Sequence, residues 1–133
     1  MQGVLCCIGD MVFKGCIPKG QRVKVGGNPF TQGFGWLDSR TPLEGSTWDR
    51  IEGWVVVEGH QADSGVLALT NGSGTIVGFV DMGKPRPDVL NEFPDTSGLN
   101  GYSGYLDRSA ASSDIFVVDD AFRCSTPLTS AVP

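Results

Sequence analysis

Two apolar, β-branched runs around a short turn sequence form the strongest local pattern in the chain. Residues 66–70 read Val-Leu-Ala-Leu-Thr, residues 75–80 read Thr-Ile-Val-Gly-Phe-Val, and Asn-Gly-Ser-Gly lies between them. Asn and Gly tolerate the positive φ angles that tight hairpin turns require. The pattern therefore predicts a β-hairpin over residues 66–80.

Further short apolar runs predict that most of the remaining chain is extended. Residues 50–57 and 114–119 have the composition of buried strands, and residues 101–106 carry two tyrosines in a strand-like run. Shorter strands are expected at residues 12–14, 22–25 and 32–37. About eight strands at this spacing are typical of a β-sandwich or barrel.

Helix formers are sparse in this sequence. The candidate is residues 87–93, where we expect Asp88 to cap a single turn before Pro94 ends it. The 19 Gly and 8 Pro favour short strands joined by turns instead. We predict an all-β chain with one antiparallel β-sandwich of immunoglobulin-like or jelly-roll type. The sandwich is expected at residues 46–124, with an N-terminal arm or extra strands at 1–45 and a tail at 125–133.

Charge and hydrophobicity exclude several classes of partner. The formal net charge is -5 and no basic run is present, whereas nucleic-acid binding depends on Lys and Arg against phosphates. We therefore expect no nucleic acid as a partner. No stretch approaches the ~20 apolar residues that span a bilayer, so no membrane insertion is expected. The first residues lack a basic, secretory-type leader, which predicts synthesis and initial retention in a cytoplasm.

The residue types that carry chemistry do not gather into a recognisable motif. Residues 78–84 fit G-x-x-x-x-G-K, but the following Pro-Arg-Pro supplies neither the hydroxyl nor the helix of a phosphate-binding loop. His60 has no G-x-S-x-G partner motif, and the carboxylates are expected at solvated turns. The sequence has no CxxC pair, so we expect no zinc site. The redox state of the four cysteines stays open; they are Cys6, Cys7, Cys16 and Cys124. We predict no enzyme, catalytic residue, metal or cofactor.

The aromatic residues are the candidates for contact with a ligand. Trp48, Tyr102 and Tyr105 are expected to meet a carbohydrate or a partner, because sugar rings stack on flat aromatic faces. The two tyrosines lie three positions apart, so in a regular strand one should face inward and the other outward. Trp54 lies within a continuous apolar run and is expected in the core, while the exposure of Trp48 stays open.

The order of four segments resembles an immunoglobulin-like module found beside bacterial glycosyltransferase domains and in surface-associated proteins. The resemblance covers roughly residues 50–122 and rests on a Gly-Trp strand, the Val-rich hairpin, Arg86-Pro87-Asp88-Val89 with Phe93-Pro94, and residues 101–106. This chain has Asn71 where that module usually has Asp, and Tyr where it has Phe. The resemblance implies a sandwich fold and a non-enzymatic role, with the ligand left open.

These expectations combine into a predicted role as a structural subunit of a large assembly. A bacteriophage-type virion component, in capsid decoration or in a tail, is the expected setting, and the virion is then the expected location. Unpaired strand edges and an N-terminal arm would bury apolar surface against protein neighbours, most simply copies of the same chain. The alternative is a carbohydrate-binding module for a cell-surface polysaccharide. Capsid versus tail, the oligomer symmetry and the glycan all stay open.

Overall fold

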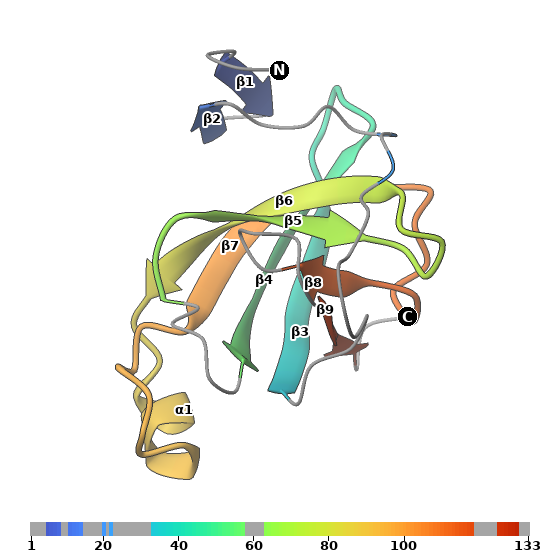
Figure 1. The fold of residues 1–133 in the computed structure, drawn as a ribbon. Helices are drawn as coiled ribbons and strands as arrows, with labels where there is room; N and C mark the ends of the chain where they lie inside the picture. Colours follow the sequence, from blue (N-terminus) through green and yellow to red (C-terminus); the bar gives the residue numbers. More distant parts are fainter. Residues whose placement is uncertain are drawn as a thin grey trace.

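The computed structural model describes residues 5–8, 11–14, 20, 22, 33–57, 63–118 and 125–130, and the elements in these ranges are almost entirely β-strands (Figure 1). The all-β prediction is therefore confirmed. The strands are β1 (Leu5–Ile8), β2 (Met11–Lys14), β3 (Gly33–Pro42), β4 (Trp48–Val57), β5 (Val66–Thr70), β6 (Ile76–Lys84), β7 (Gly101–Asp107), β8 (Phe116–Val118), β9 (Ser125–Pro127) and β10 (Thr129–Ser130), with helix α1 at Pro87–Glu92.

Eight of these strands form one hydrogen-bonded sheet, and β1 pairs with β2 in a separate antiparallel pair. The order in the large sheet is β10-β3-β4-β7-β6-β5-β8-β9. Every neighbouring pair is antiparallel except β10 and β3, which are parallel. Figure 1 shows that the sheet curls strongly, so that its first and last strands approach each other.

Residues 125–130, which we call the closing segment, nearly close the curled sheet. Its first half is β9, which pairs with β8, and its second half is β10, which pairs with β3 at the opposite end of the strand order. Leu128 lies between the two halves, is 4% exposed, and donates its backbone N–H to the Ile115 carbonyl at 2.9 Å. The predicted tail therefore contributes two strands. Strand β3, which lies within the N-terminal region predicted as an arm or extra strands, belongs to the same sheet. The range of 46–124 predicted for the sandwich is therefore too narrow.

The interior of the curled sheet is filled by alternate residues of its strands. In β4 the burial alternates along the strand, with Ile51, Val55 and Val57 inward. Directly opposite residues point to the same side of a sheet, so the inward sets of neighbouring strands meet and exclude water. The core residues with no exposed surface are Leu37, Ile51, Val55, Leu69, Val80 and Leu106.

A second buried row lies on the outer side of the same sheet. Val118, Ala68, Phe79 and Tyr105 stand opposite one another across β8, β5, β6 and β7, and none is more than 5% exposed. Both faces of the β5–β6 hairpin are therefore buried. This explains why residues 66–70 and 75–80 form continuous apolar runs instead of alternating with polar residues.

The predicted hairpin is present, but its turn uses a different glycine from the one expected. The side-chain oxygen of Asn71 accepts hydrogen bonds from the backbone N–H groups of Ser73 and Thr75. Gly74 has a φ angle of 80°, in the left-handed region that favours glycine, whereas Gly72 has no positive φ. Asn71 therefore stabilises the turn by side-chain hydrogen bonds, and Gly74 supplies the left-handed residue.

The predicted helical turn is α1, and its cap differs from the prediction. The N-cap residue is Arg86, and the helix begins at Pro87 without a side-chain cap hydrogen bond. Asp88, the expected cap, lies in the first turn and binds the Arg86 guanidinium instead. Of the shorter predicted strands, 12–14 and 32–37 correspond to β2 and β3. Residues 23–25 of the strand predicted at 22–25 lie outside the described ranges.

Candidate functional site

Four aromatic side chains gather on the outer side of the sheet where β3 and β4 meet α1. Trp36 and Trp54 stand directly opposite each other in β3 and β4. Phe34 lies two residues before Trp36 in β3 and therefore on the same side of the sheet. Phe93, just after α1, has its ring centroid 5.3 Å from that of Phe34 and 5.8 Å from that of Trp54. We call Phe34, Trp36, Trp54 and Phe93 the aromatic surface.

The aromatic surface is partly open to solvent. Phe34 is 61% exposed, and the other three rings are half-buried. The planes of Phe34 and Trp54 are tilted by 37° and 49° from that of Phe93, so the rings do not share one flat face. Trp54 was expected in the core. It instead belongs to this outer cluster, because the inward positions beside it are Gly53 and Val55.

Arg86 holds α1, and with it Phe93, against β3. Its Nη1 donates to Asp38 at 2.6 Å, and its Nε and Nη2 donate to the two carboxylate oxygens of Asp88 at 2.9 and 2.7 Å. Asp38 lies at the register irregularity of β3, between Leu37 and Ser39. The hydrogen bonds from Arg86 lower the pKa of Asp88 to about 2. The guanidinium thus connects the start of α1 to β3, the strand that carries Phe34.

We expect the Asp88→Asn variant to lose a pH-dependent part of the protein's stability. The folded pKa of Asp88 is about 2, below its ordinary value of 3.8, so the ionised carboxylate stabilises the fold above that ordinary value. This contribution is lost as the pH falls through about 2. Urea unfolding midpoints at pH 5 and pH 2 should differ less in the variant than in the wild type.

The control for this pH measurement is Glu92→Gln, which removes a charge from the same helix but none of the Arg86 contacts. It should keep the wild-type dependence on pH. Equal pH dependence of the Asp88→Asn variant and the wild type would show that the contact between Arg86 and Asp88 does not contribute to the stability of the fold.

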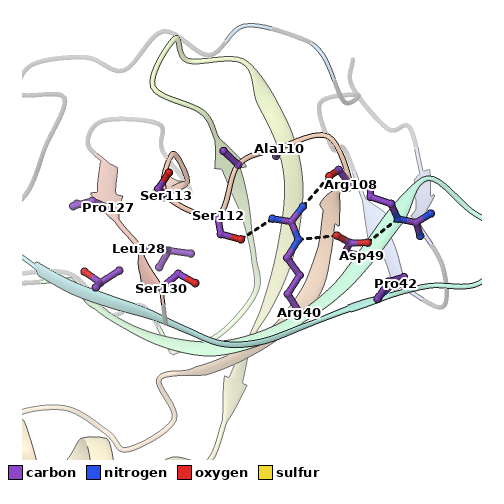
Figure 2. A pocket seen from close by; sticks show the side chains of 12 residues that line it. Arg40, Pro42, Asp49, Arg108, Ala110, Ser112, Ser113, Pro127, Leu128 and Ser130 are labelled. Carbon is purple, nitrogen blue, oxygen red and sulfur yellow. Dashed lines mark hydrogen bonds and ion pairs between the residues drawn. The ribbon is translucent and has the colours of Figure 1, made fainter. Parts of the chain in front are cut away.

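A pocket at one end of the curled sheet is the second candidate site (Figure 2). It has a volume of about 980 Å³ and opens to solvent. Its walls come from β3, β4, the loop after β7 and the closing segment, and we call it the end pocket. The residues that line it are Arg40, Pro42, Asp49, Arg108, Ala110, Ala111, Ser112, Ser113, Pro127, Leu128, Thr129 and Ser130.

Arg40, Asp49 and Arg108 form an ion cluster at the wall of the end pocket. Arg40 stands opposite the core residue Ile51, and Asp49 stands opposite Leu106, so both side chains occupy inward positions just beyond the core. Arg40 Nε donates to Asp49 Oδ2 at 2.6 Å, and Arg108 Nε donates to Oδ1 at 2.9 Å. The side chains of Arg40 and Asp49 are only 9% and 7% exposed.

The electrostatics of this cluster keep Asp49 ionised. Burial raises the pKa of Asp49, but the hydrogen bonds and charges of Arg108 and Arg40 outweigh burial, and the net pKa is lowered. Arg40 also donates to Ser112 Oγ at 2.8 Å and to the carbonyls of Asp107 and Arg108. A carboxylate held by two guanidinium groups is a poor proton acceptor, so the cluster is suited to structure and charge and not to acid–base catalysis.

Metal ligands do not gather in the part of the chain that the structure describes. No group of three His, Cys, Asp or Glu side chains is placed there to hold a metal ion. Cys6 and Cys7 lie in β1, while His60, Cys16 and Cys124 fall outside the described residues. None of the described helices is long and apolar enough to cross a membrane.

The two tyrosines predicted as contact residues are both buried. They point to opposite faces, as their spacing predicts, but each is only 2% exposed, so the expectation of one exposed ring is wrong. Tyr102 faces the core, where its hydroxyl donates to the Trp36 carbonyl at 2.9 Å, and burial raises its pKa. Tyr105 lies in the outer buried row, with the Arg50 guanidinium 5.7 Å from its ring centroid. Neither ring offers a face to a ligand.

The third predicted contact residue, Trp48, begins β4 and is half-buried. Its backbone carbonyl accepts hydrogen bonds from Leu43 N–H and from Arg108 Nη2. It does not belong to the aromatic surface as defined above. Sequence reasoning missed Phe34 and Phe93 as surface residues. The alternation Phe34-Gly-Trp36 in one strand was the available signal, because it places two large rings on one side of β3.

None of the family models, curated proteins and solved structures compared with this chain matches it. The resemblance to the immunoglobulin-like module therefore stays a prediction. The aromatic surface and the end pocket are the observations on which a function can be based.

Proposed function

We propose that the chain is a non-enzymatic structural subunit that assembles with other copies of itself through the aromatic surface. The observation that carries this proposal is the 61% exposure of Phe34 beside three further rings. Removing a Phe side chain from water is worth roughly 1.5–3 kcal/mol, and buried aromatic anchors contribute most of the energy of many interfaces. A cluster of four rings is sufficient for the centre of such an interface.

The tilt between the rings favours a protein neighbour over a sugar. Stacking of a sugar ring needs a broad, flat aromatic face, whereas these rings are inclined to one another by 37° and 49° and two of them are half-buried tryptophans. Tilted rings interdigitate well with the side chains of another protein. A copy of the same chain is the simplest neighbour, because most soluble oligomers are symmetric homo-oligomers.

A virion is one assembly in which a small β subunit of this kind is repeated many times, and it stays the setting that we propose. Attachment to a cell-surface polysaccharide is the competing function. The two functions differ in what the aromatic surface contacts, so association of the pure protein distinguishes them.

We expect Phe34→Ser to weaken self-association by on the order of thirtyfold, since loss of a central aromatic contact costs about 2 kcal/mol or more. Sedimentation velocity over a range of protein concentrations measures this change. The unfolding midpoint should change little because Phe34 is mostly exposed. Val66→Ser is the matched control, since Val66 is 36% exposed in β5 and lies outside the aromatic surface.

Two results would contradict the proposal. The first is a wild-type chain that stays monomeric at every concentration, and the second is association that Phe34→Ser leaves unchanged. A monomeric chain that binds polysaccharide, and loses that binding with Phe34→Ser, would support the competing function instead.

A further inference from the structure

The end pocket carries a local positive charge in a negatively charged protein. Arg40 and Arg108 contribute two positive charges to its wall and Asp49 contributes one negative charge, whereas the whole chain has a formal net charge of -5. The lowered pKa of Asp49 keeps its carboxylate ionised near neutral pH. The resulting surplus of one positive charge favours an anionic group in the pocket.

Arg108 is the cation of the cluster that is best placed to meet a ligand. Its side chain is 45% exposed, whereas that of Arg40 is 9% exposed. Nε donates to Asp49, and Nη2 donates to the carbonyls of Leu43 and Trp48. These contacts fix the guanidinium in place, and its Nη1 has no hydrogen-bond partner among the described residues. A fixed guanidinium donates to a carboxylate at a smaller cost in side-chain entropy than a mobile one.

Hydroxyl groups line the other side of the end pocket. Figure 2 shows Ser113 and Ser130 on the side of Arg40 opposite to Asp49 and Arg108. Ser113 and Thr129 are both exposed pocket residues, and Pro127 and Ala111, which are exposed as well, add apolar surface to the lining. Hydroxyl side chains donate to and accept from hydroxyl groups of a ligand, and an apolar patch suits the C–H face of a sugar ring.

From this arrangement we propose that the end pocket binds a hydroxylated carboxylate of about disaccharide size. The carboxylate would contact Arg108, and the sugar hydroxyls would contact Ser113 and Thr129. The volume of about 980 Å³ lies at the upper end of the range typical of small-ligand pockets, and Figure 2 shows Ser113 and Ser130 across Arg40 from Arg108. A ligand that meets both the cation and the hydroxyls must therefore be longer than acetate. This site is separate from the aromatic surface and independent of the proposed assembly.

The test uses lactobionate, an acidic disaccharide, and follows backbone amide chemical shifts by NMR. Lactobionate should saturate the shifts of residues 108–113 and 128–130 with a dissociation constant of about 1 mM or lower. Neutral lactose and acetate should each bind at least about tenfold more weakly, because each lacks one of the two kinds of contact. Arg108→Gln should weaken lactobionate binding by about tenfold or more. Lys84→Gln removes an exposed charge outside the pocket and should leave binding unchanged.

The combined variant Ser113→Ala with Thr129→Val keeps the proposal testable if Arg108→Gln fails to fold. It should reduce the preference for lactobionate over acetate without removing the charge. Equal binding of lactobionate and acetate would overturn the proposal, since the pocket would then attract any anion. The absence of saturable shifts, or shifts that Arg108→Gln leaves unchanged, would also overturn it.

Discussion

Replacing Asp49 by Asn should lower the free energy of unfolding by about 3–5 kcal/mol, the range for removing one partner from a buried ion pair. Asp49 accepts hydrogen bonds from both Arg40 and Arg108, and its side chain is 7% exposed. The neutral amide would leave the Arg40 guanidinium, whose side chain is 9% exposed in the wall of the end pocket, without its ionised partner. Urea denaturation at neutral pH measures the change.

The control for this experiment is Asp81→Asn, which removes an exposed ion pair. Asp81 lies 3.2 Å from Lys84, and both side chains are nearly half exposed. Exposed pairs contribute about 0–1 kcal/mol, so this variant should unfold almost as the wild type does. Similar losses in the two variants would contradict the role of burial assigned to Asp49.

The effect of Asp49→Asn should also depend on pH. The pKa of Asp49 is lowered in the folded protein, so its ionised form stabilises the fold above the ordinary value of 3.8, and this contribution is lost as the pH falls through the lowered folded pKa. The difference between wild type and variant should therefore shrink in acid. A difference that stays constant down to pH 2 would contradict this assignment.

The second large effect is expected from Leu128→Ala, at about 2–5 kcal/mol. Leu128 is 4% exposed, and it packs where the closing segment passes from β9 to β10. An alanine would leave a cavity between the core and the strand that nearly closes the sheet. Chemical denaturation measures the loss, and amide hydrogen exchange should show faster opening of residues 129–130 than of β6.

Val66→Ala is the control for the cavity, since it shortens an aliphatic side chain that is 36% exposed. It should cost less than about 1 kcal/mol. Equal losses for the two variants would mean that Leu128 contributes through general hydrophobicity and not through its place in the closing segment.

The elements that the sequence predicted correctly are those whose signals come from residues close together in the sequence. The hairpin over 66–80 follows from two apolar runs and an Asn-Gly turn, and the helical turn was predicted from Asp88 and the turn-ending Pro94. The closing segment reads Ser-Thr-Pro-Leu-Thr-Ser, which has no strand signal of its own. It is extended because β8, a few residues before it, and β3, which is distant in sequence, offer hydrogen bonds to its two halves.

The candidate sites could be predicted only in part, because they depend on which distant residues the sheet brings together. Trp36 and Trp54 could be recognised as aromatic candidates, but their shared surface follows from the register of β3 with β4. Phe93 joins them from just after α1, which Arg86 connects to Asp38 of β3. Tyr105 was expected at the surface as one of two alternatives, and it is instead buried in the same outer row as Phe79 and Ala68.

The parallel pairing of β10 with β3 has a consequence for how the polypeptide acquires its structure. Ser130 stands beside Leu37, although the two residues are far apart in the sequence. Contacts this remote are slow to form, and proteins dominated by them typically fold in milliseconds to seconds. During synthesis on a ribosome, β3 and β4 can pair early, but the other edge of β3 is covered only after residue 130 has been made. For that interval the exposed edge is a site at which two nascent chains can associate wrongly.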